Sequence, residues 1–257
     1  MRRSNLLKDI KKIASPPKSV ADRNDTQSLS QTQINLNMPI EPSDIVIRKY
    51  EPRDRAAVRR ISSQTAFLDR PKDFVEDEEI LADALTIYFT DYEPESSFVA
   101  TYQNQVVGYL IGAKSLSAME KVFRWRIFPR VFLKAIRRGI LLDKKALRFF
   151  GNIILSFLKG EFFMPNIFDE HPAAFHINMD PNFRGLKAGE KLLEMYLSYL
   201  KENRIRGVYA CTMSERAKTF MMKSGLKILY QTKRSYMRYV LNQEVPIYLL
   251  GTEFSYN

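Results

Sequence analysis

The stretch over residues 173–191 constrains the fold more than any other part of the chain. Residues 173–179, AAFHINM, alternate like a β-strand, and the next three, Asp-Pro-Asn, signal a turn because proline cannot donate to a sheet. Residues 184–189, RGLKAG, then open into a helix with an apolar stripe formed by Leu192, Leu193, Tyr196, Leu197 and Leu200. A helix N-terminus after such a turn suits an anion, because its first N–H groups are unbonded and the helix dipole is positive there. An ordinary strand-to-helix turn gives the same local pattern.

The loop resembles the pyrophosphate loop of the GNAT superfamily of acyl-CoA-dependent N-acyltransferases, which reads Arg/Gln-x-x-Gly-x-Gly/Ala. Arg184 and Gly189 stand at its first and last positions, and Lys187 replaces the first glycine. This lysine either adds a charge to the diphosphate or narrows its pocket. The resemblance implies that the diphosphate of the cofactor is held by Arg184, Gly185, Leu186, Lys187, Ala188 and Gly189.

The order of the flanking elements is also that of the GNAT superfamily. Ahead of the central strand we expect a strand at 45–50, helices ending near 67 and 89, and a hairpin of strands 97–102 and 105–112. After the loop we expect a strand at 207–211, a helix from 215 to 224 between Ser214 and Gly225 as its caps, and strands at 226–231 and 234–241. The predicted fold class is mixed α/β: a GNAT-like central mixed sheet flanked by helices, with an inserted helical segment.

The predicted domain organisation follows from this order. Residues 1–43 form a disordered tail, with a possible short basic amphipathic helix at 3–14, because they carry too few large apolar groups to offset the entropy of ordering. The acyltransferase domain spans 44–241 and is interrupted by a basic helical insertion at 114–170. Residues 242–257 are a C-terminal extension, apolar enough to pack against the domain.

The resemblance further implies that the donor is acetyl-CoA or another acyl-CoA. Its pantetheine arm pairs with backbone groups near Asn178 and Met179 like an added strand. Ser214, at the start of the helix after the next strand, is included among the cofactor-binding residues. In the same helix Met221 stands where the family has a tyrosine that protonates the departing CoA thiolate, and methionine cannot donate a proton.

His176 is the candidate general base, because it lies on the central strand and is neutral near pH 7. Two alternatives stay open: a structural histidine turned into the core, and a residue that binds the acceptor. We expect His171 and the acidic run at 91–95 to lie in solvated loops, although the carboxylates of that run could hold an amine.

The function that these patterns predict is acyl transfer, with acetyl the first choice, from acyl-CoA to an amine by direct attack. The alternative is a catalytically weak acyl-CoA-binding or membrane-associated scaffolding module on the same fold. The acceptor is a small-molecule or protein amine, and nothing in the sequence separates the two.

Composition narrows the setting. The chain has one cysteine, Cys211, and two histidines, so we expect neither an internal disulfide nor a metal site. No apolar run long enough to span a bilayer and no secretory signal are present, so we expect a cytoplasmic protein, if membrane-associated then peripheral at the inner face.

The charge is concentrated in the insertion. Residues 114–160 carry twelve Lys and Arg against Glu120 and Asp143, a net +10 of the +11 of the whole chain. Glycines and a proline divide the segment into two or three helices of about 10–14 residues, too short to span a membrane. Aromatic and aliphatic residues alternate with the charges, which suits an anionic membrane surface or an acidic carrier protein. A lid with its apolar face on the domain and its charges in solvent is the plainer interpretation. Nucleic acid is disfavoured because no reading motif is recognised.

Overall fold

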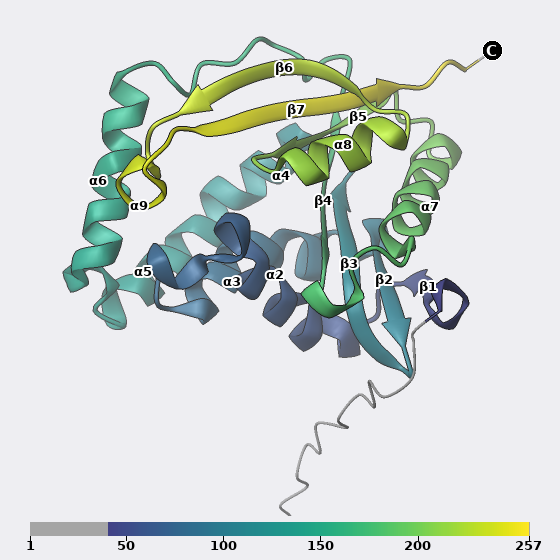
Figure 1. The fold of residues 1–257 in the computed structure, drawn as a ribbon, viewed down its shortest axis with the longest axis horizontal. Helices are drawn as coiled ribbons and strands as arrows, with labels where there is room; N and C mark the ends of the chain where they lie inside the picture. The colour runs from purple at the N-terminus through teal and green to yellow at the C-terminus, as the bar shows by residue number, and fades with distance from the viewer. Residues whose placement is uncertain (1–40, 257) are drawn as a thin grey trace, which may run out of the picture. The chain divides into compact units, whose positions relative to one another are not determined.

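The computed structural model describes residues 41–256 (Figure 1). The predicted helix at 3–14 and nearly all of the predicted disordered tail lie outside the described residues. A seven-stranded sheet runs in the order β1-β2-β3-β4-β5-β7-β6, antiparallel at every junction except the parallel pair β4–β5. The predicted mixed sheet with flanking helices is confirmed.

The first half of the sheet is built as expected. The main elements are β1 (Val46–Lys49), α2 (Arg55–Asp69), α3 (Glu78–Ile87), β2 (Ser97–Tyr102) and β3 (Gln105–Ala113). Gln103 and Asn104 join β2 to β3 with φ of 48° and 63°, the two left-handed residues that a tight hairpin needs. Short helical turns occupy Pro42–Asp44, Pro52–Asp54, Pro71–Asp73, Tyr88–Tyr92, Pro94–Ser96 and Pro181–Phe183.

The second half contains one wrong prediction. Its elements are β4 (Ala173–Met179), α7 (Ala188–Glu202), β5 (Gly207–Thr212), α8 (Glu215–Lys223), β6 (Lys227–Arg234), α9 (Arg238–Leu241) and β7 (Val245–Glu253). The strand expected at 234–241 is instead the end of β6 and the short helix α9. The predicted C-terminal extension contains β7, which lies between β5 and β6 in the sheet. Residues 247–251 of this strand are buried, which explains why the run is apolar.

The insertion is helical, as predicted. It consists of α4 (Leu116–Val122), a π turn (Phe123–Ile127), α5 (Phe128–Arg137), a 3-10 turn (Ile140–Leu142) and α6 (Lys144–Leu158). Pro129 lies in the first turn of α5, where its missing N–H costs no bond, and Gly139 separates α5 from α6 with φ of 69°. Among the described residues, no helix is long and apolar enough to cross a membrane.

Helices cover both faces of the sheet. Helix α2 packs against β3 and β4 on one face, and α7 packs against β2, β3 and β4 on the other (Figure 1). Tyr196 of α7 lies flat against the sheet because Gly112 has no side chain: a Cβ there would come within 2.4 Å of the tyrosine ring. The Tyr196 hydroxyl donates to the carbonyl of Ala174 at 3.0 Å, the last residue of β4 that pairs with β5. This packing fixes the point where the two strands part.

Candidate functional site

The central feature of the sheet is a fork between β4 and β5. The two strands pair only at Ala173–Val208 and Ala174–Tyr209, whereas β4 stays paired with β3 as far as Met179. The N–H of Asp180 donates to Val107 of β3 at 2.8 Å, so strand alternation turns the backbone groups of Ile177 and Met179 toward the open side. This open edge can accept an extended ligand as an added strand.

A row of unpartnered N–H groups lies beside the fork. The backbone N–H groups of residues 185–190 donate to no acceptor among the described residues, and α7 begins without a side-chain cap. Gly185 and Lys187 adopt left-handed conformations, with φ of 92° and 57°. The loop and the first turn of α7 therefore present donors and the positive end of a helix dipole, the requirements of an anion site.

The conformation of Lys187 explains why a glycine suits this position. A left-handed backbone costs a residue with a Cβ roughly 1–2 kcal/mol, and glycine avoids that cost. The Lys187 side chain is exposed. At Gly189 an added Cβ would meet Phe220 at 3.5 Å and Ile177 at 3.9 Å, an ordinary contact. Because Gly189 has no side chain, the space between the loop and Phe220 stays open, and a larger residue at this position would fill it.

The guanidinium of Arg184 is already hydrogen-bonded within the fold. It donates two hydrogen bonds to Asp69, at 2.6 and 2.7 Å, and a third to the carbonyl of Met179 at 3.3 Å. The hydrogen bonds with Asp69 raise the pKa of Arg184 above its ordinary value. The end of α2 is thereby tied to the loop.

The terminus of α2 that holds this carboxylate is strained. Phe67, Leu68 and Asp69 have successive φ values of 51°, 61° and 64°. Three non-glycine residues in this region store roughly 1–2 kcal/mol each. The sequence carries no signal for this conformation, and Asp69 was missed for that reason.

His176 lies on the other face of the same strand. Phe175 contacts Tyr196 on the α7 side, whereas the His176 ring makes an edge contact with Phe89, with ring centroids 5.9 Å apart. The imidazole is exposed rather than enclosed in the core, and it has no hydrogen-bond partner among the described residues. Desolvation by the surrounding protein lowers its pKa, so the ring is neutral at pH 7. The interpretation as a core histidine is not supported, and the role of base stays a prediction.

Asn178 shares the face of His176. Its amide donates to the hydroxyl of Tyr109 at 2.8 Å, which fixes the side chain away from the α7 side. Strand alternation also turns the backbone groups of Asn178 toward β3, so Ile177 and Met179 are the residues of β4 whose backbone groups face the open edge. The structure thus brings Asn178, Met179 and residues 184–189 together at one end of the fork.

Ser214 belongs to the other arm of the fork. Its hydroxyl accepts the N–H of Ala217 at 3.3 Å, which confirms it as the N-cap of α8, and Gly225 ends that helix with φ of 92°. Met221 is 4% exposed, so the family tyrosine position is a core position in this chain. Tyr209, opposite Ala174, lies on the face of His176, and burial raises its pKa to about 12. No local pattern pointed to Tyr209, because its face depends on the register of β5 against β4.

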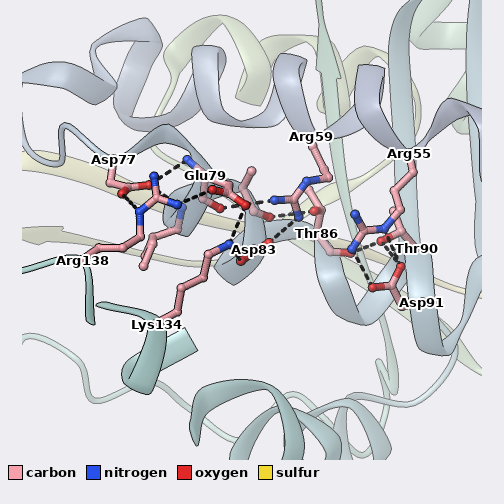
Figure 2. Close-up of polar contacts among 12 residues, drawn as sticks. Arg55, Arg59, Asp77, Glu79, Asp83, Thr86, Thr90, Asp91, Lys134 and Arg138 are labelled. Carbon is pink, nitrogen blue, oxygen red and sulfur yellow. Dashed lines mark hydrogen bonds and ion pairs between the residues drawn. The ribbon is translucent and has the colours of Figure 1, made fainter. Parts of the chain in front are cut away.

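The expected solvated loops are wrong for Glu93 of the acidic run and for His171. Glu93 is buried and accepts hydrogen bonds from Tyr88 at 2.8 Å, Ser96 at 2.6 Å and the backbone of Lys114 at 2.8 Å. Its neighbour Asp91 forms an ion pair with Arg55 at 2.8 Å (Figure 2). Glu93 is therefore enclosed by the fold, whereas Asp91 and Glu95 stay exposed while they pair with Arg55 and Lys114.

His171 is also buried, at 2% exposure. Its Nδ1 lies 3.1 Å from the carbonyl of Ile167, and its Nε2 lies 3.8 Å from a carboxylate oxygen of Glu253. Burial follows from its place at the start of β4, under β7. Glu170, His171 and Glu253 each offer one ligand atom within 4.8 Å of the others, so these three are the described residues that could hold a metal ion.

Comparison with known proteins agrees with this geometry. The sequence profile of the acetyltransferase (GNAT) family matches residues 64–225, more than half of the chain. The crystal structure of SsHAT matches with a TM-score of 0.63 and 24% identity, covering 83% of this chain and 100% of that one. The polyamine N-acetyltransferase of Drosophila melanogaster, which forms N-acetylagmatine, matches with a TM-score of 0.51 and 12% identity, covering 82% and 100%. The comparison with curated proteins gives no match.

These findings confirm the expected fold and the expected class of donor substrate. The profile match includes the hairpin, the fork, the loop at residues 184–189 and helix α8 up to Gly225. Acetyl-CoA or another acyl-CoA is the donor in this family, and an open β4 edge beside unpartnered N–H groups fits its extended arm and its diphosphate. The chain therefore belongs to the GNAT acetyltransferase family.

Proposed function

We propose that the chain is an N-acyltransferase that moves an acetyl group from acetyl-CoA directly to an amine. The observation that carries the proposal is the open edge of β4 next to the unpartnered N–H groups of residues 185–190. Pantetheine would pair with Ile177 and Met179, and the diphosphate would accept the N–H groups of the loop. The thioester would then lie near the narrow end of the fork.

In the proposed reaction the amine nitrogen attacks the thioester carbonyl carbon. A C–N bond forms, the C–S bond breaks, and the coenzyme leaves as a thiolate. His176, held neutral by desolvation and accessible on the fork, takes the proton that the attacking amine must lose. The thiolate takes a proton from water, because Met221 cannot supply one.

The acceptor in this proposal is an amine of a small molecule or of a protein. Agmatine and polyamines are the first small molecules to try, because N-acetylagmatine is the product of the Drosophila enzyme of the same fold. A peptide with a free N-terminus and a lysine-containing peptide represent the protein acceptors. Release of CoA thiol with one member of this set, above the uncatalysed rate, identifies the acceptor class.

Binding tests the donor half separately. Calorimetric titration with acetyl-CoA is expected to show a complex with the wild-type chain and none with Gly189→Asp, which places a carboxylate against the diphosphate. Gly151→Asp is the matched control, because an added Cβ at Gly151 meets no atom within 4 Å and the residue lies outside the fork. Equal binding by both variants would remove the loop from the site.

A second candidate is an acyl-CoA-binding module that turns over slowly. The engagement of Arg184 by Asp69 and the burial of Met221 favour it. The two candidates separate by activity, not by binding. A wild-type chain that binds acetyl-CoA and releases no thiol with any amine of the set would be the module.

A further inference from the structure

The insertion carries most of the exposed apolar surface of the molecule. Fifteen of the twenty-one large hydrophobic side chains that are exposed in the described residues belong to residues 114–170. Trp125 is 75% exposed and Leu158 74%. Scattered exposed apolar side chains are normal, but a concentration in one segment marks an interaction surface.

Helix α5 has apolar residues on two sides, and the inner row, with Val131 and Ala135, packs against Ile80 of α3. Lys134 contacts Glu79 and Asp83 of α3, both at 2.7 Å, and Arg138 contacts Asp77 at 2.6 Å (Figure 2). These cations point toward the domain. The apolar residues on the outer side of α5 are 46–52% exposed; they are Phe128, Phe132, Leu133 and Ile136. The lid interpretation accounts for the buried row, but a surface helix ordinarily exposes charges rather than a second row of large apolar side chains.

Helix α6 also exposes large apolar side chains on its outer side. Its inner side is complete, because Phe149 packs against Phe74 and Tyr236 in a buried cluster and Ala146 is fully enclosed. An outer stripe at helical spacing remains exposed and consists of Leu147, Phe150, Ile154, Phe157 and Leu158. The core of the described domain is therefore complete without this outer stripe, and no described residue covers it.

Cations surround these stripes without acidic partners. No ion pair within the described part of the chain engages five exposed cations of the insertion: Lys121, Arg124, Arg126, Arg137 and Lys144. Arg124 and Arg126 flank Trp125, and Arg137 follows Ile136 on α5. Asp143, one of two acids in residues 114–160, is used as the N-cap of α6.

Exposed apolar stripes bordered by cations without ion pairs in the described chain favour one kind of binding partner. A second copy of the chain would bring its own cations against these cations, a repulsive contact. An anionic lipid surface satisfies both features, because headgroups pair with the cations while aromatic and aliphatic side chains enter the boundary below them. We propose that the outer faces of α5 and α6, with Trp125, form a surface that binds anionic phospholipid membranes peripherally. The proposal rests on the insertion alone and is independent of the acyl-transfer reaction.

The test uses Trp125 as a built-in probe, because it is the one tryptophan in the full sequence. The full chain is titrated with vesicles of phosphatidylcholine alone and with vesicles that also contain phosphatidylglycerol. With the anionic vesicles we expect a blue shift of the tryptophan emission, protection from a water-soluble quencher, and co-sedimentation. No shift with anionic vesicles, or equal binding to both kinds, would overturn the proposal.

Two variants test the contribution of the surface within the full chain. Each cation near an anionic surface contributes about fivefold to the partition coefficient, so the triple change R124Q, R126Q and R137Q is expected to weaken binding about a hundredfold. The matched control is K49Q, K227Q and K233Q, three exposed lysines outside the insertion without ion pairs in the described chain, with less than a tenth of that loss expected for the same charge change. Equal losses in the two triples would show general charge attraction and overturn the assignment to α5 and α6.

Other occupants give their own outcomes. Concentration-dependent association in sedimentation velocity that shields Trp125 without vesicles would assign the surface to a second copy and overturn the membrane proposal. A blue shift with poly-glutamate but not with anionic vesicles would assign it to an acidic protein, with the same consequence. Circular dichroism and melting of each variant confirm that the compared chains are folded.

Discussion

The ion pair between Asp69 and Arg184 gives the most informative single substitution. Asp69→Asn removes the carboxylate that occupies Arg184 but keeps a residue type that tolerates φ of 64°. If the proposed site is correct, the released guanidinium becomes available to the diphosphate, and a negative charge leaves the neighbourhood of the loop. The variant is therefore expected to bind acetyl-CoA more tightly than the wild type.

The magnitudes follow from the exposure of the pair and from the charges. The two side chains are 25% and 43% exposed, so the pair contributes about 0.5–1 kcal/mol to stability, and its loss lowers the melting temperature by about 1–4 °C. If the Asp69 carboxylate lies on the order of 8 Å from the bound diphosphate, loss of its charge in a water-like dielectric removes a repulsion from two negative charges of about 1 kcal/mol, or about fivefold in Kd.

Calorimetric titration with acetyl-CoA at low and high salt measures this gain, which should shrink as salt rises. Asp73→Asn is the matched control, because Asp73 pairs with Arg70 at 2.6 Å and lies outside the loop. Weaker binding by Asp69→Asn, at a melting temperature within the expected range, would refute the reasoning. Asp69 would then position Arg184 for the cofactor rather than compete with it.

Four further outcomes are expected. Lys187→Gly removes the left-handed strain but adds unfolded-state entropy, so unfolding should become harder by about 0.5–1 kcal/mol in denaturant titration; a loss of stability would contradict the strain argument. His176→Ala should keep acetyl-CoA binding and lose turnover. Because desolvation lowers the pKa of His176, the wild-type kcat/KM should fall only at a pH below the ordinary range of a histidine, where the base becomes protonated; turnover unchanged in the variant would exclude the role. Asp54 is 4% exposed, and although burial opposes its charge, hydrogen bonds from Arg48 and the backbone of Glu51 hold its pKa below 3.8. The contribution of Asp54 to stability is therefore present above pH 3.8 and is lost as the pH falls through the lower folded pKa. Asp54→Asn should flatten the decline of stability in acid, and an unchanged decline would contradict this. Met221→Tyr should overpack the core and destabilise by about 1–3 kcal/mol without raising turnover, and a faster enzyme would show that the position still reaches the thiolate.

Much of the fold could be predicted because local chemistry and tertiary context agree in it. The hairpin turn at Gln103-Asn104, the Ser214 cap and the Gly225 terminus are each set by residues close in sequence, and each prediction is confirmed. Strand β7 was missed because nothing near residue 245 shows that β5 and β6 leave a gap between them. Its central place comes from long-range pairing, which a local pattern cannot reveal.

In the candidate site, too, features set by neighbouring residues could be predicted, and features set by long-range contacts could not. The candidate loop at residues 184–189 could be predicted because it is one continuous segment, whereas the partner of Arg184 lies 115 residues away on a strained helix end. The burial of Glu93 and His171 depends on packing against β3 and β7, so their residue types alone suggested solvent. In the insertion the composition indicated amphipathic helices correctly, but only the structure shows that α5 buries one apolar row and exposes a second one.

Amide hydrogen exchange on the full chain, with and without saturating acetyl-CoA, tests the central claim most directly. The account predicts that the N–H groups of residues 185–190 and those of Ile177 and Met179 gain protection on binding, because the diphosphate and the pantetheine arm become their acceptors. Strand β1, which lies at an edge of the sheet, is the control, and its N–H groups should exchange at an unchanged rate. Bound acetyl-CoA that leaves residues 185–190 as exchangeable as before would place the cofactor elsewhere and contradict the account.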